Sequence, residues 1–232
     1  FKRSSNEGFV VSAATDRLVR VVLDGNGAPT INAPLMAGDP GNIVRIEVGL
    51  DPPGAEGNSN PQGLVLNSSD TRAYVMNYIS KDVSVIDLTA SPELELARVS
   101  SADLPAAGSD GAKFLLGNQL FNSSRGTFDE GVTERMSSEG WQACASCHPD
   151  GLSDGVIWAF AAGPRKTIPL NSTFSPSNQT GDQRILNYSA VFDEVEDFEL
   201  NIRGVSGGPG LIVLAGTTDQ DPNVKAFDPP NA

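Results

Sequence analysis

The chain has 232 residues, 39% of them hydrophobic, which is enough to bury one large core or two modest ones. Its 29 acidic residues outnumber its 16 basic residues, and the formal net charge of −13 excludes nucleic acid as an expected partner, because phosphate binding depends on clustered Lys and Arg. No segment approaches the roughly 18 consecutive apolar residues that span a bilayer, and no signal sequence opens the chain. We therefore expect a soluble piece of a longer protein, without a transmembrane segment.

The first hundred residues have the pattern of short strands. Runs of β-branched residues with period-two alternation are separated by Gly, Asn, Asp and Pro, which is typical of antiparallel β structure. Strands are predicted over Phe9–Ala13, Leu18–Leu23, Ile43–Val48, Gly63–Asn67, Ala73–Asn77, Val83–Leu88 and Ala97–Ser100.

Part of this region repeats. Segments 9–23 and 74–88 read FVVSAATDRLVRVVL and YVMNYISKDVSVIDL, an offset of 65 residues. They agree in the positions of their apolar residues, their turn and their second strand. Repeats of four strands are typical of β-propeller blades, because a single blade cannot bury both of its faces. The offset is long for one blade, so we expect an inserted loop between residues 25 and 60.

The run at 60–88, NPQGLVLNSSDTRAYVMNYISKDVSVIDL, resembles one YVTN-type β-propeller repeat. Fewer than two such blades are present, whereas a closed propeller needs at least about four. The resemblance implies that further blades lie in a part of the protein outside this chain. The alternative is a small sheet packed on the next domain.

After Pro105 the sequence changes from short strand-like runs to helix-like runs with small residues between them, which predicts a domain boundary. The expected fold class is mixed, with an antiparallel β segment of partial propeller blades over 1–105 and a mainly α-helical domain over 106–232. Helices are predicted over 110–122, from Ser137 or Ser138 through the cysteine motif, and, with an amphipathic pattern, over 189–202.

The strongest chemical signal is Cys144-Ala145-Ser146-Cys147-His148, which has the spacing Cys-x-x-Cys-His of c-type haem attachment. Two cysteines three residues apart on a helical turn present both sulfurs to one haem, and the following imidazole is directed at the iron. The chain has two cysteines and one histidine in total, and all three lie in this motif. One covalent haem c is the cofactor that the motif predicts.

Three other interpretations each require something that the sequence lacks. A disulfide between cysteines this close would be strained and would close almost no loop. A thioredoxin-type pair belongs at the start of a helix in a βαβ unit. A tetrahedral zinc site needs a fourth ligand, and beyond this motif the chain has no other Cys or His.

Two further segments extend the interpretation. The segment Gly117-Asn118-Gln119-Leu120-Phe121 resembles the Gly-x-x-Leu-Phe of class I cytochrome c domains. Together with the run at 136–170, it resembles the haem domain of dihaem cytochrome c peroxidase-like proteins, some of which are fused to YVTN propellers. The resemblance covers roughly residues 112–210.

The resemblance implies roles for several side chains. Cys144 and Cys147 form the thioethers, and His148 is the proximal ligand. Arg165 is a haem-propionate donor or a surface charge. The aromatic walls of the haem pocket are Trp141, Trp158 and Phe160.

The second axial ligand of the iron is not identified by the sequence. No methionine follows His148, although a class I cytochrome c takes its second ligand from a downstream methionine. Met136 is the nearest methionine, and Tyr188, water or a residue outside this chain are the alternatives. Met36 and Met76 are expected in the core of the β segment.

Electron transfer is the predicted function, with the β segment as a docking and assembly scaffold. The alternative is a haem enzyme that reduces peroxide or oxidises a small substrate together with a second haem outside this chain. An assembly subunit that offers its sheet edges to other chains is compatible with the first. Because thioethers form after export, we expect a periplasmic or extracellular protein. Its partners would be redox proteins, or subunits of a membrane-associated or extracellular complex.

Two other segments are predicted to have no catalytic role. The acidic cluster at 193–197 is expected to be the solvated face of a helix. The glycine-rich run at 204–210 lacks the Lys and Ser/Thr of a phosphate-binding loop and is expected to be a turn.

Overall fold

The computed structural model describes residues 1–31, 45–48, 59–91, 93–125, 135–160, 163–171, 173, 186, 192 and 195–214. The chain forms two compact units, residues 1–127 (unit 1) and 128–232 (unit 2). The boundary between the units lies after the first predicted helix, whereas the sequence analysis placed a domain boundary before it. That helix is therefore part of unit 1.

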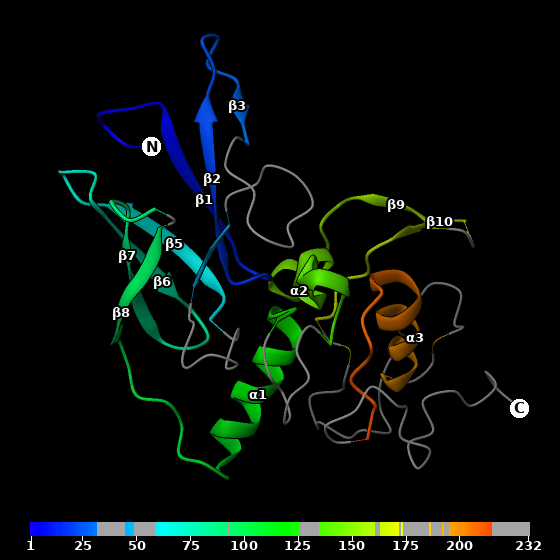
Figure 1. The fold of residues 1–232 in the computed structure, drawn as a ribbon. Helices are drawn as coiled ribbons and strands as arrows, with labels where there is room; N and C mark the ends of the chain where they lie inside the picture. Colours follow the sequence, from blue (N-terminus) through cyan, green and yellow to red (C-terminus); the bar gives the residue numbers. More distant parts are fainter. Residues whose placement is uncertain are drawn as a thin grey trace, which may run out of the picture. The chain divides into compact units, whose positions relative to one another are not determined.

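Unit 1 contains two four-stranded antiparallel sheets (Figure 1). In the first sheet β2 is central and pairs with the three other strands; in the second the four strands form a meander in chain order. The first sheet consists of β1 (Glu7–Ser12), β2 (Arg17–Leu23), β3 (Pro29–Thr30) and β4 (Arg45–Glu47), and the second of β5 (Pro61–Leu66), β6 (Arg72–Asn77), β7 (Asp82–Asp87) and β8 (Leu94–Ser100).

The core of unit 1 is formed by both sheets. Its buried members alternate with exposed ones along β6, as expected for strands with one face in a core. Burial of such side chains removes apolar surface from water and stabilises the unit. The core cluster is Phe9, Leu18, Ile46, Val48, Ala73, Val75, Ile86 and Leu88.

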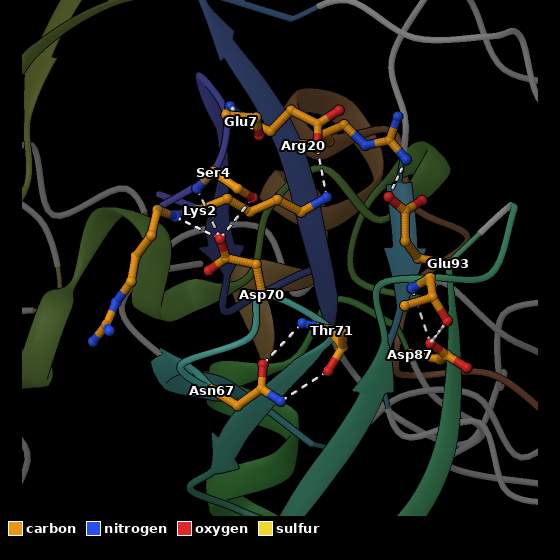
Figure 2. Close-up of polar contacts among 12 residues, drawn as sticks. Lys2, Ser4, Glu7, Arg20, Asn67, Asp70, Thr71, Asp87 and Glu93 are labelled. Carbon is orange, nitrogen blue, oxygen red and sulfur yellow. Dashed lines mark hydrogen bonds and ion pairs between the residues drawn. The ribbon is translucent and has the colours of Figure 1, made fainter.

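Polar contacts also join the two sheets (Figure 2). The Asp70 carboxylate accepts hydrogen bonds from the backbone N–H groups of Arg3 and Ser4 at 2.7 and 2.9 Å, and from the Ser4 hydroxyl at 2.8 Å. Arg20 of β2 forms an ion pair with Glu93, which precedes β8. These contacts fix the N-terminal segment and β2 against the second sheet.

Helix α1 (Asp110–Asn122) follows the sheets and has the predicted bounds. Its N-cap is Ser109, because the Ser109 hydroxyl accepts from the backbone N–H of Ala112 at 3.2 Å. Beyond the helix, Ser124 donates its backbone N–H to the carbonyl of Ala14 at 2.8 Å. The end of α1 is therefore tied to the β1–β2 turn.

The predicted fold class is wrong in two respects, and the first is the propeller. The described residues of unit 1 form two packed four-stranded antiparallel sheets, and a β-propeller is not shown. The repeat is still visible, because its two copies are the β1–β2 and β6–β7 hairpins. The number of sheets that pack around a repeat depends on the rest of the chain and does not follow from one repeated hairpin.

The second error is the mainly α-helical domain. Within the described part of unit 2, the α-helical segments are α2 (Cys144–Cys147) and α3 (Glu199–Asn201), and β9 (Ile157–Phe160) pairs with β10 (Gly163–Lys166). The helix predicted from Ser137 is a 3₁₀ turn that stops at Gly140, where φ is +65°. A left-handed residue cannot continue a right-handed helix.

Short turns also replace the third predicted helix. Residues 189–191, 193 and 194 lie outside the described residues, and the remainder forms a 3₁₀ turn, α3 and a π-helical turn at Ile202–Ser206. Asp197 and Glu199 are buried, so the expectation of a solvated acidic face is wrong at Asp197. Glu199 is held by Arg203 at 2.9 Å and by the Leu211 N–H at 2.8 Å.

The glycine-rich run packs against the segment that precedes the cysteine motif. Gly207 bridges to Ser137 as an antiparallel partner, and the Gly210 N–H donates to the Arg135 carbonyl at 3.1 Å. A side chain at Gly208 would collide with the backbone of Arg135 and Met136. Glycine is therefore required for close approach of two backbones, a role beyond the predicted turn.

Candidate functional site

The cysteine motif forms a single helical turn with defined ends. Ala143 is extended, and its backbone N–H donates to the Ser146 hydroxyl at 3.0 Å. The His148 N–H then donates to the Cys144 carbonyl at 3.0 Å. Residues three apart share one face of a helical turn, so Cys144 and Cys147 lie on the same side. The turn stops there because Pro149 disfavours helical backbone at the preceding residue.

Both cysteines are free thiols in an environment that keeps them protonated. Burial raises the pKa of Cys144 to about 11. Burial, and then the nearby Asp154 carboxylate, raise the pKa of Cys147. A redox-active pair needs at least one thiol with a lowered pKa, because the thiolate is the nucleophile. The site therefore does not fit a thioredoxin-type function.

His148 is held as a neutral imidazole. Burial lowers the pKa of its ring, opposed by the carbonyls of Leu152 and Ile168 and by Asp154. Ring Nδ1 lies 3.3 Å from the Leu152 carbonyl oxygen, which can only accept, so the tautomer protonated at Nδ1 would donate to it. This tautomer leaves the lone pair on Nε2, which is the arrangement found in metal-bound histidines.

Asp154 organises the loop after the motif, and the sequence interpretation missed it. Its backbone N–H donates to the Cys147 carbonyl at 3.2 Å, and its carboxylate accepts from the Val156 N–H at 3.0 Å and the Trp158 indole at 2.8 Å. Burial raises the pKa of Asp154, but hydrogen bonds from Val156, Trp158 and Thr167 outweigh it and the pKa is lowered. The signal in the sequence was the Ser-Asp-Gly turn, in which Asp commonly binds backbone two residues on.

Two predicted haem contacts lie opposite each other on the β9–β10 hairpin. Trp158 of β9 is the register partner of Arg165 of β10, and side chains of directly opposite residues share one face. Trp158 is partly buried and bonded to Asp154, whereas Arg165 is exposed and donates to the Pro164 carbonyl at 3.1 Å. Arg165 as a propionate donor stays a prediction.

Apolar side chains around the motif are exposed. Trp141 is anchored by its indole N–H, which donates to the Ser206 carbonyl at 3.0 Å, yet half of its surface faces solvent. The exposed fractions are 50% for Trp141, 47% for Leu152, 46% for Val156, 71% for Ile157 and 37% for Phe160.

The methionines occupy different settings. Met136 is buried, with 3% of its surface exposed, in the segment pinned by Gly207 and Gly210. Met76 of β6 is 44% exposed, so its predicted core role is wrong. Met36 lies outside the described residues, as does Tyr188. Met136 as a ligand of iron stays a prediction.

The described residues hold no group of three or more Cys, His, Asp or Glu side chains that could bind a metal ion. The prediction of a metal-binding protein is therefore wrong for the described residues taken by themselves. This also argues against the zinc alternative at Cys144 and Cys147. Haem attachment differs from such a site, because the porphyrin supplies four of the iron ligands and the chain supplies the rest.

Comparison with known proteins gives no family. No family model matches the sequence, and no curated protein matches it. A solved structure, a "putative 6-phosphogluconolactonase" from Bacteroides uniformis, matches with 19% identity over 44% of this chain and 25% of its own. Its TM-score is 0.31, which is too low to support an argument.

The identification made from sequence resemblance is therefore wrong. The described part of unit 2 lacks the helices of a cytochrome c domain of the dihaem peroxidase type, and a YVTN-type propeller is not shown. No described helix is long and apolar enough to cross a membrane, as predicted. The chemistry of the motif at 144–148 does not depend on those resemblances.

Proposed function

We propose that the chain transfers electrons through one haem, covalently bound at Cys144 and Cys147 and ligated by His148. The observation that carries the proposal is geometric: two thiols lie three residues apart on one helical turn, followed at once by an imidazole whose Nδ1 lies beside the Leu152 carbonyl. These groups fit haem c and fit neither a redox-active dithiol nor a zinc site. When bound, haem supplies one-electron chemistry between ferric and ferrous iron.

The thiols react by addition. Each S–H would add across one vinyl C=C bond of haem: the sulfur would bond to one carbon, the hydrogen would go to the other, and no external oxidant would be consumed. Protonated thiols with raised pKa values resist formation of a Cys144–Cys147 disulfide, which would block that addition. The chain thus keeps both sulfurs available.

Other residues of unit 2 shape the surroundings of the proposed haem. Asp154 fixes the loop that follows Cys147 and holds Trp158. Exposed apolar residues, among them Trp141 and Ile157, offer the surface that the porphyrin would cover, and excluding water from it stabilises the complex. Unit 1 serves as the docking and assembly scaffold. Because thioethers form after export, the proposed location is periplasmic or extracellular.

Mass spectrometry of denatured protein tests the attachment. The wild-type chain, exported by a host that attaches haem to exported proteins, should keep the mass of one haem after denaturation. Each single substitution, Cys144→Ala or Cys147→Ala, should leave one thioether, and the double variant should retain none. Ala145→Ser is the matched control, because it changes the same turn without touching a thiol or the ring. A bare polypeptide mass for wild type would contradict the proposal.

A kinetic measurement separates electron transfer from peroxide reduction. Electron transfer predicts that the ferrous protein is reoxidised rapidly by a small one-electron acceptor and turns over peroxide slowly. Met136→Ala tests the second ligand: if the thioether of Met136 ligates the iron, the near-infrared band of a sulfur ligand should disappear. Rapid peroxide turnover by wild type would favour the enzyme over the carrier.

A further inference from the structure

The loop between the cysteine motif and β9 is held together by Asp154. The backbone N–H of Asp154 donates to the Cys147 carbonyl at 3.2 Å. One oxygen of its carboxylate accepts from the Val156 N–H at 3.0 Å, and the other accepts from the Trp158 indole N–H at 2.8 Å. The backbone and both carboxylate oxygens of this residue are therefore bonded, and the carboxylate has a fixed position between the motif and β9.

These bonds favour the ionised form of the Asp154 carboxylate. The N–H groups of Val156 and Trp158 donate hydrogen bonds and cannot accept them, so they stabilise an acceptor with negative charge. Burial acts in the opposite direction, but the hydrogen bonds outweigh it, and the pKa of Asp154 lies below its ordinary value. The loop therefore carries a fixed negative charge at neutral pH.

The charge of Asp154 acts on two groups of the motif. Burial has the larger effect on both, since it lowers the pKa of the His148 ring and raises the pKa of the Cys147 thiol. The Asp154 charge raises both pKa values, because a carboxylate stabilises an imidazolium and destabilises a thiolate. A positive charge that forms beside these two residues is stabilised in the same way.

We propose that Asp154 is a positioning residue of the haem site and that its fixed negative charge lowers the reduction potential of the iron. This inference rests on the function proposed above, because it requires haem at Cys144, Cys147 and His148. Ferric iron carries one more positive charge than ferrous iron, so a nearby carboxylate stabilises the ferric state more. Groups around the ligands, their charge and their hydrogen bonds are among the means by which proteins set such potentials.

Two substitutions separate the charge of Asp154 from its bonds. Asp154→Asn removes the charge and keeps an amide oxygen that can still accept a hydrogen bond. Trp158→Phe removes the indole donor and keeps both an aromatic ring and the Asp154 charge. If the charge sets the potential, the first substitution has the larger effect on it.

Asp150 provides a matched control for the loss of one negative charge. It lies in the same loop and is exposed, with φ of +53°, a left-handed conformation that Asn tolerates as Asp does. Water and salt screen an exposed charge. Asp150→Asn should therefore change the ferrous-to-ferric ratio at a fixed applied potential by less than about twofold.

A spectroelectrochemical titration at low ionic strength tests the proposal. Mass spectrometry of each denatured protein first shows whether it carries one haem. Asp154→Asn should raise the midpoint potential by about 59 mV, which corresponds to a roughly tenfold higher ferrous-to-ferric ratio at a fixed applied potential. Asp154→Glu keeps the charge and should lie closer to wild type, and Trp158→Phe should shift the potential less than Asp154→Asn does.

Several results would overturn the role of Asp154 while haem attachment stands. An unchanged or lowered potential in Asp154→Asn would exclude an effect of its charge, and an equal rise in Asp150→Asn would show that the position of the charge is unimportant. If Asp154→Asn attaches no haem, Trp158→Phe decides: a potential close to wild type supports the proposal, and a tenfold shift overturns it.

The failure of this proposal and the failure of the proposed function give different results. A bare polypeptide mass for wild type would overturn both. A wild-type protein that carries haem, with a potential that does not respond to Asp154→Asn, would overturn the role of Asp154 alone.

Discussion

Unit 1 and unit 2 are stabilised by different interactions. Unit 1 buries a continuous apolar cluster between two sheets. In the described part of unit 2, the buried apolar side chains are Met136, Ala143 and Leu186, and the structure depends on hydrogen bonds and on glycines that allow close backbone contact. In the proposal made above, unit 1 needs no cofactor, whereas the haem would cover apolar side chains that are exposed in the described part of unit 2.

Leu18→Ala should have the largest effect and should be confined to unit 1. Leu18 is fully buried, and truncation of such a residue costs about 2–5 kcal/mol through lost burial and an unfilled cavity. Chemical denaturation should show the loss in the transition of unit 1, while amide exchange at 135–148 stays at its wild-type rate. Equal destabilisation of both units would contradict the claim that the effect of Leu18 is confined to unit 1.

Asp16 makes the stability of unit 1 depend on pH. Burial raises the pKa of Asp16 to about 6, although the Asn60 N–H and Ser123 hydroxyl bind the carboxylate. Because the folded pKa lies above the unfolded value of 3.8, the folded state binds the proton more tightly. This contribution is present below about pH 4 and is lost as pH rises through about 6, a change of roughly 3 kcal/mol.

Asp16→Asn isolates that contribution. Asparagine keeps an acceptor for the Asn60 N–H, tolerates left-handed backbone and does not titrate. Denaturation of both proteins from pH 4 to pH 7 should show a difference in free energy of unfolding that grows in favour of the variant as pH rises. A constant difference would mean that Asp16 titrates as it does in the unfolded chain.

Gly210→Ala should destabilise unit 2 by about 2 kcal/mol or more. Its φ is +103°, and an added Cβ would overlap the carboxylate of the buried Glu199. Gly204→Ala is the control, since an added Cβ there would meet no neighbouring segment of the described chain within 4 Å, and its φ is not left-handed. The control should change stability by no more than about 1 kcal/mol. Similar effects of the two substitutions would show that the contact between Gly210 and Glu199 is unimportant.

The same contrast explains which features the sequence could predict. The strands of unit 1 and the bounds of α1 follow from local patterns, namely alternation, a repeated hairpin and a capped helix. The sequence did not predict which face of β6 is buried and which is exposed, because both faces carry apolar residues. Packing alone decides that Val75 is buried and Met76 is exposed.

Unit 2 was less predictable because single residues control its backbone. Gly140 and Pro149 interrupt the helix predicted around the motif, and neither changes the apolar pattern. The β9–β10 hairpin was missed because Pro164 lies within one four-residue strand and the loop lacks the two-residue turn signal. Cys144, Cys147 and His148 were predicted from their spacing, whereas the Ser-Asp-Gly turn signals only the bond from Asp154 to the Val156 N–H, and the bonds that join Asp154 to Cys147 and Trp158 required the fold.

Amide hydrogen exchange with peptide mass readout tests most directly the claim that haem completes unit 2 and not unit 1. Wild type from a haem-attaching host is compared with the Cys144→Ala, Cys147→Ala variant. We predict that the peptide containing residues 144–148 carries the mass of haem, that attachment slows exchange over 141–160, and that exchange over 72–87 is the same in both proteins. A haem-free peptide, or equal exchange over 141–160, would contradict the account.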